Sequence, residues 1–256
     1  MKFNLIRSTV KNSIRYFILS LSIVYFLNPV LADAQMFSVQ PERQQTIYVP
    51  DLSINFGLSY VDFQYRGPRL VNALSPAGSF EFSEPVYHIG VDMPGFSAYG
   101  LFGRSLGNAN NSYSQIGASV GNNFFIVPGR TFNLSVPVKL ATDYVVIKNN
   151  QLLNTQEFKQ NTFGIHSGLE MRTRLSNQSR FEVLGSAGYS YSVSGFGNSG
   201  GTATDLSIKN RLYFDGIIQQ YGLMIGFELS SRKYDLENEL YRYLAVQQQV
   251  VIGITF

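Results

Sequence analysis

The C-terminal residues alternate strictly between two kinds of side chain, and this pattern limits the fold more than any other feature. Counted back by twos, one face is almost entirely apolar: Phe256, Ile254, Ile252, Val250, Gln248, Val246 and Leu244. The other face carries small or polar residues: Thr255, Gly253, Gln249 and Gln247. A period of two residues with one apolar face predicts a β-strand that separates two different environments.

The same alternation recurs along the chain and predicts ten strands. We expect them at about 51–66, 80–92, 96–105, 112–127, 131–148, 158–175, 179–195, 204–214, 217–232 and the C-terminus. In the third strand, which is the least regular, Tyr99 and Leu101 are expected on the apolar outer face. Most of these segments reach the 9–11 residues that a tilted strand needs to cross a membrane. Eight or twelve strands remain possible, because the second to fourth are the hardest to delimit.

Short and long connections alternate between the predicted strands. The short ones carry turn-forming residues: Met93-Pro94-Gly95, Val127-Pro128-Gly129-Arg130, Ser176-Asn177-Gln178 and Asp215-Gly216. The longer ones lie at about 67–79, 106–111, 149–157, 196–203 and 233–239. This alternation places both ends of the mature chain on the side of the short turns, as in bacterial membrane barrels.

The first 34 residues have the pattern of a secretory signal peptide. A basic segment precedes the apolar run 17–27, and Ala32 and Ala34 form a small-x-small cleavage pattern. A retained anchor is disfavoured, because a membrane-spanning helix needs about 20 apolar residues. We therefore expect a cleaved signal at 1–34, a periplasmic leader at 35–50 and a β-barrel at 51–256.

Removal of this signal leaves a mature chain close to electrical neutrality. The full chain has 20 Lys and Arg against 17 Asp and Glu, and the signal contains four of the basic residues and one acid. The basic excess therefore lies in the discarded segment and gives no support to nucleic-acid binding. The chain has no cysteine, which excludes disulfides and acylation on cysteine.

The signal Met1–Ala34 and the terminal strand resemble those of the small outer-membrane β-barrel proteins of Gram-negative bacteria. The resemblance implies an all-β, antiparallel up-and-down barrel of about ten strands, located in the bacterial outer membrane and in contact with its lipid and lipopolysaccharide. It also implies that the apolar C-terminal residues are a folding signal for the barrel-assembly machinery: Val250, Ile252, Ile254 and Phe256. It identifies no subfamily, since barrels of one shape serve unrelated functions.

If the apolar faces contact lipid, the opposite faces line the lumen, and their charged residues form the candidate site. The principal members have mixed signs: Lys139, His166, Glu170, Arg172, Glu182, Lys209, Arg211 and Glu228, with Arg104, Arg174 and Arg180 as further candidates. A symmetric hairpin about Asn177 predicts that Arg172 lies opposite Glu182, within reach of an ion pair. Mixed signs favour pairing that closes the lumen, and a narrow channel for small solutes is the alternative.

The sequence offers no convincing catalytic or metal-binding arrangement. His166 and Ser167 are adjacent and point to opposite faces, although Ser186 or Ser190 could approach His166 and Glu170 in a lipid-active hydrolase. Several acids are expected in loops rather than in a cation site: Asp205, Asp235, Glu237 and Glu239. We therefore predict a non-catalytic barrel with a structural or surface-interaction role and no cofactor.

Tyrosines near the strand ends are expected to form girdles at the membrane surface, where an amphipathic ring is favoured. These are Tyr60, Tyr144, Tyr189, Tyr191, Tyr241 and Tyr243.

Overall fold

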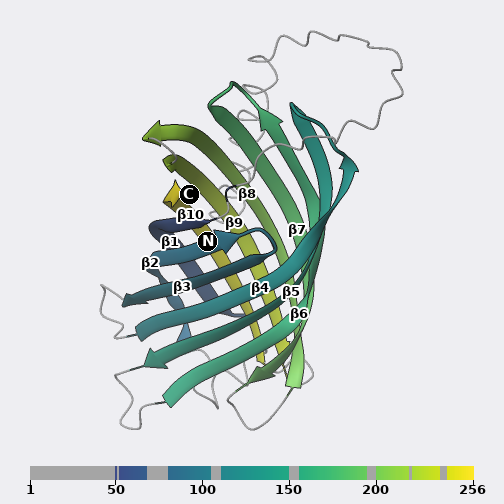
Figure 1. The fold of residues 1–256 in the computed structure, drawn as a ribbon. Coiled ribbons are helices and arrows are strands. Elements are labelled where there is room, and N and C mark those ends of the chain that lie inside the picture. Colours follow the sequence, from purple (N-terminus) through teal and green to yellow (C-terminus); the bar gives the residue numbers. More distant parts are fainter. Residues whose placement is uncertain are drawn as a thin grey trace, which may run out of the picture. The chain divides into compact units, whose positions relative to one another are not determined.

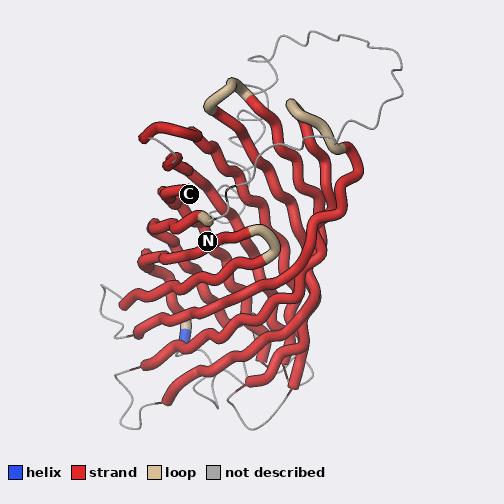
Figure 2. The backbone as a smooth tube through the Cα atoms, viewed as in Figure 1, coloured by secondary structure: helices blue, strands red, loops and turns tan. Residues whose placement is uncertain are grey.

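The computed structural model describes residues 50, 52–67, 80–104, 111–149, 156–194, 200–218, 221–236 and 241–256. Within them, ten antiparallel strands follow one another along the chain (Figures 1 and 2). They are β1 (Ser53–Tyr65), β2 (Phe82–Met93), β3 (Phe96–Arg104), β4 (Asn111–Val127), β5 (Phe132–Asn149), β6 (Gln156–Arg174), β7 (Ser179–Ser194), β8 (Gly200–Ile218), β9 (Tyr221–Leu236) and β10 (Tyr241–Thr255). The expected all-β class is confirmed, while the signal peptide, with Ala32 and Ala34, lies outside the described residues.

The strands close into one barrel, because β1 pairs with β2 on one side and with β10 on the other. Following the paired residues once around the barrel from Ser53 leads back to β1 at Tyr65, a displacement of 12 residues. This displacement, set against ten strands about 4.8 Å apart, tilts the strands by about 40° from the barrel axis. The up-and-down barrel is therefore the fold that the alternating sequence predicts.

The outward faces are apolar, as the alternation predicts. In β10, Val250, Ile252 and Ile254 are 55%, 56% and 50% exposed, whereas Val251 between them is buried. Exposed aromatic and aliphatic residues continue around the wall on the other strands, for example Phe56, Tyr87, Ile116, Phe163, Leu206 and Phe227. Among the described residues, no helix is long and apolar enough to cross a membrane.

The face assignment of β3 is wrong in the prediction. Leu101 is fully buried and Tyr99 points to the interior, while Phe96 and Phe102 are exposed on the outer face. Arg104 shares that outer face and is exposed, so it is not a lumen residue. Both faces of this strand carry large apolar residues, and the alternation alone therefore does not distinguish the inside from the outside.

The predicted turn at Asp215-Gly216 is also misplaced. Both residues belong to β8, where the pairing with β9 is irregular between Phe214 and Ile218 and Gly216 has a φ of 66°. The glycine thus serves a bulge within the strand, which needs the same left-handed conformation as a turn. The short turns Met93-Pro94-Gly95 and Ser176-Asn177-Gln178 lie where they were predicted.

The interior has two parts with different chemistry. A cluster of buried aromatic and aliphatic side chains occupies the end of the barrel next to the long connections, and we call it the aromatic cluster: Val61, Phe63, Tyr65, Phe80, Phe82, Val86, Leu101, Tyr113, Val145, Ile147, Phe158, Ala203, Tyr234, Leu236, Tyr243 and Ala245. Between it and the short turns the interior is mainly polar and charged. The prediction of a polar lumen therefore applies only to the second part.

Candidate functional site

The aromatic cluster spans the whole width of the lumen. Phe63 on β1 contacts Phe158 on β6 with ring centroids 5.3 Å apart, and these strands are five positions apart in either direction around the barrel. Tyr243 on β10 packs against both rings, at 5.0 Å from Phe63 and 4.9 Å from Phe158. All three side chains are buried, so opposite walls of the barrel are in contact near the long connections.

The aromatic cluster corrects one prediction made from the sequence. Tyr243 was expected in the outer girdle but is fully buried inside, and Tyr241 packs partly against the same cluster. Tyr60, Tyr144, Tyr189 and Tyr191 are exposed on the outside, as a girdle requires. The sequence signal for this closure is that the strands become apolar on both faces near the long connections, as in Val145-Val146-Ile147.

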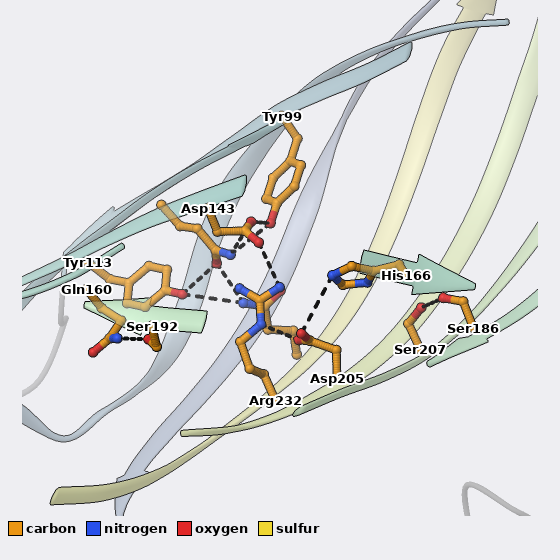
Figure 3. Close-up of polar contacts among 12 residues, drawn as sticks. Tyr99, Tyr113, Asp143, Gln160, His166, Ser186, Ser192, Asp205, Ser207 and Arg232 are labelled. Carbon is orange, nitrogen blue, oxygen red and sulfur yellow. Dashed lines mark hydrogen bonds and ion pairs between the residues drawn. The ribbon is translucent and has the colours of Figure 1, made fainter. Parts of the chain in front are cut away.

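A charged bridge crosses the lumen, and Figure 3 shows its Arg232 between Asp143 and Asp205. Arg232 on β9 lies between two carboxylates: its Nη2 is 2.7 Å from Asp143 Oδ2 on β5, and its Nε donates to Asp205 Oδ1 on β8. Strands β9 and β5 are four positions apart around the barrel. The side chains of Arg232, Asp143 and Asp205 are only 14%, 5% and 11% exposed, so this bridge is largely shielded from solvent.

Neutral hydrogen bonds extend this bridge to other strands. Tyr99 on β3 donates its hydroxyl to Asp143, and Gln115 on β4 donates its amide to the Tyr99 oxygen at 2.8 Å. Gln247 on β10 donates to Gln115 Oε1 at 2.8 Å, and Tyr113 donates to the same oxygen at 2.7 Å. The polar part of the lumen is therefore crossed both between β9 and β5 and between β10 and β4.

The predicted Arg172–Glu182 pair has the geometry that the hairpin implies. The two residues are directly paired in the β6–β7 register, and Arg172 Nε is 2.9 Å from Glu182 Oε2. Glu170 also contacts Arg172 and accepts a hydrogen bond from Asn123 at 2.8 Å. These charges form a cluster near the short turns.

Three further predicted residues take partners that the sequence did not specify. Lys209 Nζ is 3.0 Å from Glu228 Oε2 on the neighbouring strand. Arg211 Nη2 is 3.1 Å from Asp92 Oδ2 on β2, which lies across the lumen. Arg180 Nη2 is 3.2 Å from Asp215 Oδ1. Arg174 is exposed at the end of β6.

A cavity of about 160 Å³ remains between these bridges. Lys139, His88 and Gln249 are among its lining residues. Lys139 forms no hydrogen bond or ion pair with any other residue in the part of the chain that the structure describes, and it is paired with His166 in the β5–β6 register. The space is large enough for several water molecules, which need polar partners of this kind.

The conceivable Ser–His–acid set is not assembled. His166 Nε2 lies 3.8 Å from Asp205 Oδ2, and Glu170 is engaged elsewhere. Ser186 Oγ shares a hydrogen bond with Ser207 Oγ at 2.7 Å instead of contacting the imidazole (Figure 3). Within the described ranges, no group of three or more His, Cys, Asp or Glu side chains could hold a metal ion.

The sequence reasoning missed the acids that complete the bridge. Asp205 was assigned to a loop because it falls at the very start of the expected strand 204–214, whereas β8 begins at Gly200 and contains Asp205. Asp235 also belongs to a strand, β9, and contacts Lys233 at 2.6 Å and Arg242 at 3.0 Å. Glu237 and Glu239 lie outside the described residues. Asp143 is four residues after Lys139 on the same strand, so both side chains point to the same face. The alternation along β5 could therefore have identified Asp143 as a lumen residue.

A closed barrel with an apolar exterior, a filled interior and alternating short and long connections is the architecture of outer-membrane β-barrel proteins. The chain has the fold of this class, a closed antiparallel barrel of ten strands in its described residues. No protein-family model and no curated protein matches it.

Solved structures with a related fold have low sequence identity. The outer membrane protease OmpT from Escherichia coli is 8% identical, with a TM-score of 0.48 over 84% of this chain and 100% of that chain. Ail of Yersinia pestis, solved with the heparin analogue sucrose octasulfate, is 10% identical, with a TM-score of 0.29 over 80% of this chain and 97% of that chain. A Pseudomonas aeruginosa FadL homologue is 8% identical, with a TM-score of 0.26 over 80% of this chain and 89% of that chain.

Proposed function

We propose that this protein is a non-conducting and non-catalytic outer-membrane barrel that acts through its outward surfaces, in a structural or surface-interaction role. The observation that carries this proposal is the contact between Phe63 and Phe158, which joins opposite walls of the lumen. A solute that entered from the side of the long connections would have to displace these buried aromatic rings from their apolar contacts.

Two ion pairs that cross the lumen nearer to the short turns support the same proposal. Arg232 joins β9 to β5, and Arg211 joins β8 to Asp92 on β2. Separating either pair would leave a carboxylate and a guanidinium without partners in a poorly solvated space, which is costly. A narrow solute channel, the alternative function, would require all of these contacts to open together.

The outward surface supports two kinds of partner. The exposed apolar belt fits the hydrocarbon of the outer membrane, with lipopolysaccharide at its external face. The C-terminal residues Val250, Ile252, Ile254 and Phe256 are all exposed on this surface, where an assembly factor could read them before the strand is embedded.

Conductance across a planar bilayer tests the closed lumen. We expect no steady open steps from the wild-type barrel, and more frequent brief openings when Phe63→Ala is combined with Phe158→Ala. Phe56→Ala, on the outer face of the same strand β1, is the matched control and should behave as the wild type. Steady open steps in the wild type would refute the proposal.

Incubation with labelled lipopolysaccharide tests the absence of catalysis. We expect no turnover above the protein-free background with the wild type or with His166→Ala. Turnover by the wild type that His166→Ala abolishes would identify a lipid-active enzyme and overturn this part of the proposal.

A further inference from the structure

The wall of the barrel is shortest at β2 and β3, and the neighbouring β1 is also short, with 13 residues. β2 has 12 residues and β3 has 9, whereas β5 has 18 and β6 has 19. The missing length is on the side of the short turns: β3 pairs with β4 only as far as Phe96↔Val120, and β4 continues to Val127. Figure 2 shows the turn between β2 and β3 ending well before the turns that follow β4 and β6.

The register gives the size of this step. The last contact of β4 with the β2–β3 turn is the hydrogen bond from Gly121 N–H to the Gly95 carbonyl, at 2.8 Å. Beyond it β4 stays paired with β5 as far as Val127↔Leu134. At about 3.3 Å per residue and a tilt of about 40°, the β4–β5 turn extends roughly 10 Å farther along the barrel axis, on the side of the short turns, than the β2–β3 turn does. We call this step in the rim the notch.

The notch leaves one edge of β4 without a strand partner in the described part of the chain. Beyond Gly121, the backbone groups on the β3 side face outward into the notch, and the exposed amide side chain of Asn122 lies beside them. Closer to the β4–β5 turn, four consecutive residues are all exposed: Phe124, Phe125, Ile126 and Val127. Because successive residues of a strand point to opposite faces, β4 exposes apolar side chains on both of its faces here. Polar backbone and apolar side chains thus meet at one site on the membrane-facing wall.

Hydrocarbon cannot surround such an edge at low cost. Backbone N–H and C=O groups without partners are tolerated within a membrane only where protein or water satisfies them. On the longer strands, exposed apolar residues continue past the notch toward the short turns, as far as Phe132 on β5 and Tyr221 on β9. A flat bilayer that covered these residues would therefore bury the notch in acyl chains. Either a partner protein or headgroups and water must therefore satisfy the backbone groups at the notch.

Pairing with a strand of another protein is the competing explanation, and the edge has features that oppose it. Asn122 Oδ1 accepts the backbone N–H of Asn123 at 2.8 Å, which removes a donor that a new strand would need. A β-bulge between Phe125 and Val127 distorts the remaining edge. Bulges are among the devices that proteins use to prevent edge pairing.

We propose that the notch is a contact site for phospholipid headgroups of the inner leaflet, and that the barrel thins this leaflet locally beside β2 and β3. The headgroup layer follows the rim, so that it stands several ångströms higher at the β2–β3 turn than along β5 to β8. The bilayer contact of this barrel is therefore asymmetric around its circumference.

The chain contains no tryptophan, which permits a direct measurement of depth with single tryptophans. By register and tilt, Phe96 on β3 and Leu169 on β6 lie within about 2 Å of the same height along the axis, and both are exposed on the outer face. The mature chain of each variant is folded into vesicles of brominated phosphatidylcholines, and bromine quenching gives the depth of its tryptophan. Given the roughly 10 Å step in the rim, we expect the tryptophan of Phe96→Trp to lie at least roughly 5 Å shallower than that of Leu169→Trp.

A second pair of variants controls for differences between strands. Tyr87 on β2 and Tyr189 on β7 lie at nearly equal heights in the outer half, where the rim has no step. Tyr87→Trp and Tyr189→Trp should therefore be quenched at equal depth. If Phe96→Trp and Leu169→Trp are also equally deep, the bilayer is flat at the notch, a partner strand must cover the edge, and the proposal is overturned.

Discussion

Replacing Arg232 with methionine tests whether the charged bridge holds the barrel closed. The substitution keeps most of the side-chain volume but leaves Asp143 and Asp205 without the cation that they share. The three side chains are 14%, 5% and 11% exposed, so water can only partly replace the guanidinium. Removing one partner of a buried ion pair costs about 3–5 kcal/mol. We expect about 3 kcal/mol, because Tyr99 and Gln115 still donate to Asp143.

Urea unfolding of the barrel in lipid vesicles, followed by circular dichroism, measures this loss. Lys233→Met is the matched control, because Lys233 is the next residue on β9 but is 54% exposed and contacts Asp235. Its loss should cost less than about 1 kcal/mol. Adding Asp143→Asn to Arg232→Met should restore part of the stability, since one uncompensated carboxylate is removed. Equal costs for Arg232→Met and Lys233→Met would refute the view that the bridge is buried and cohesive.

Three other tests examine different parts of the structure, with unfolding in lipid as the common measurement. Phe158→Ala should cost about 3–5 kcal/mol, because it empties the centre of the aromatic cluster. Phe227→Arg, on the lipid face near the middle of β9, should cost about 2–4 kcal/mol, whereas Tyr60→Arg near the outer interface should cost about 0–1 kcal/mol. A double-mutant cycle between Arg172→Ala and Glu182→Ala should give a coupling of about 0.5–3 kcal/mol, and zero coupling would contradict their 2.9 Å contact.

The architecture could be predicted because lipid imposes the same rule on every strand. In β10 the outward residues Val250, Ile252 and Ile254 are apolar, and the inward residues Gly253 and Thr255 are small or polar. No partner or register is needed to recognise this pattern. In β3 the rule gave the wrong face, because Tyr99 and Leu101 are large residues that point inward toward other strands.

The internal contacts divide according to how far apart the partners are along the chain. Arg172 and Glu182 are joined through a tight turn, so their pairing follows from local geometry alone. Arg232 and Asp143 face each other only because the barrel closes with a displacement of 12 residues between Ser53 and Tyr65. That displacement depends on the register of every strand pair, which the alternation of single strands does not determine.

The two parts of the interior suit the two sides of the membrane. The aromatic cluster lies next to the long connections, which face the external medium in barrels of this class, and under the proposed function this apolar contact excludes ions and water. The charged bridges and the cavity lie toward the short turns, where the periplasm supplies water and the lower wall is stepped. The aromatic cluster and the notch are thus at opposite ends of the barrel. Conductance therefore tests the aromatic cluster, and tryptophan depth tests the notch. Either conclusion can fail without affecting the other.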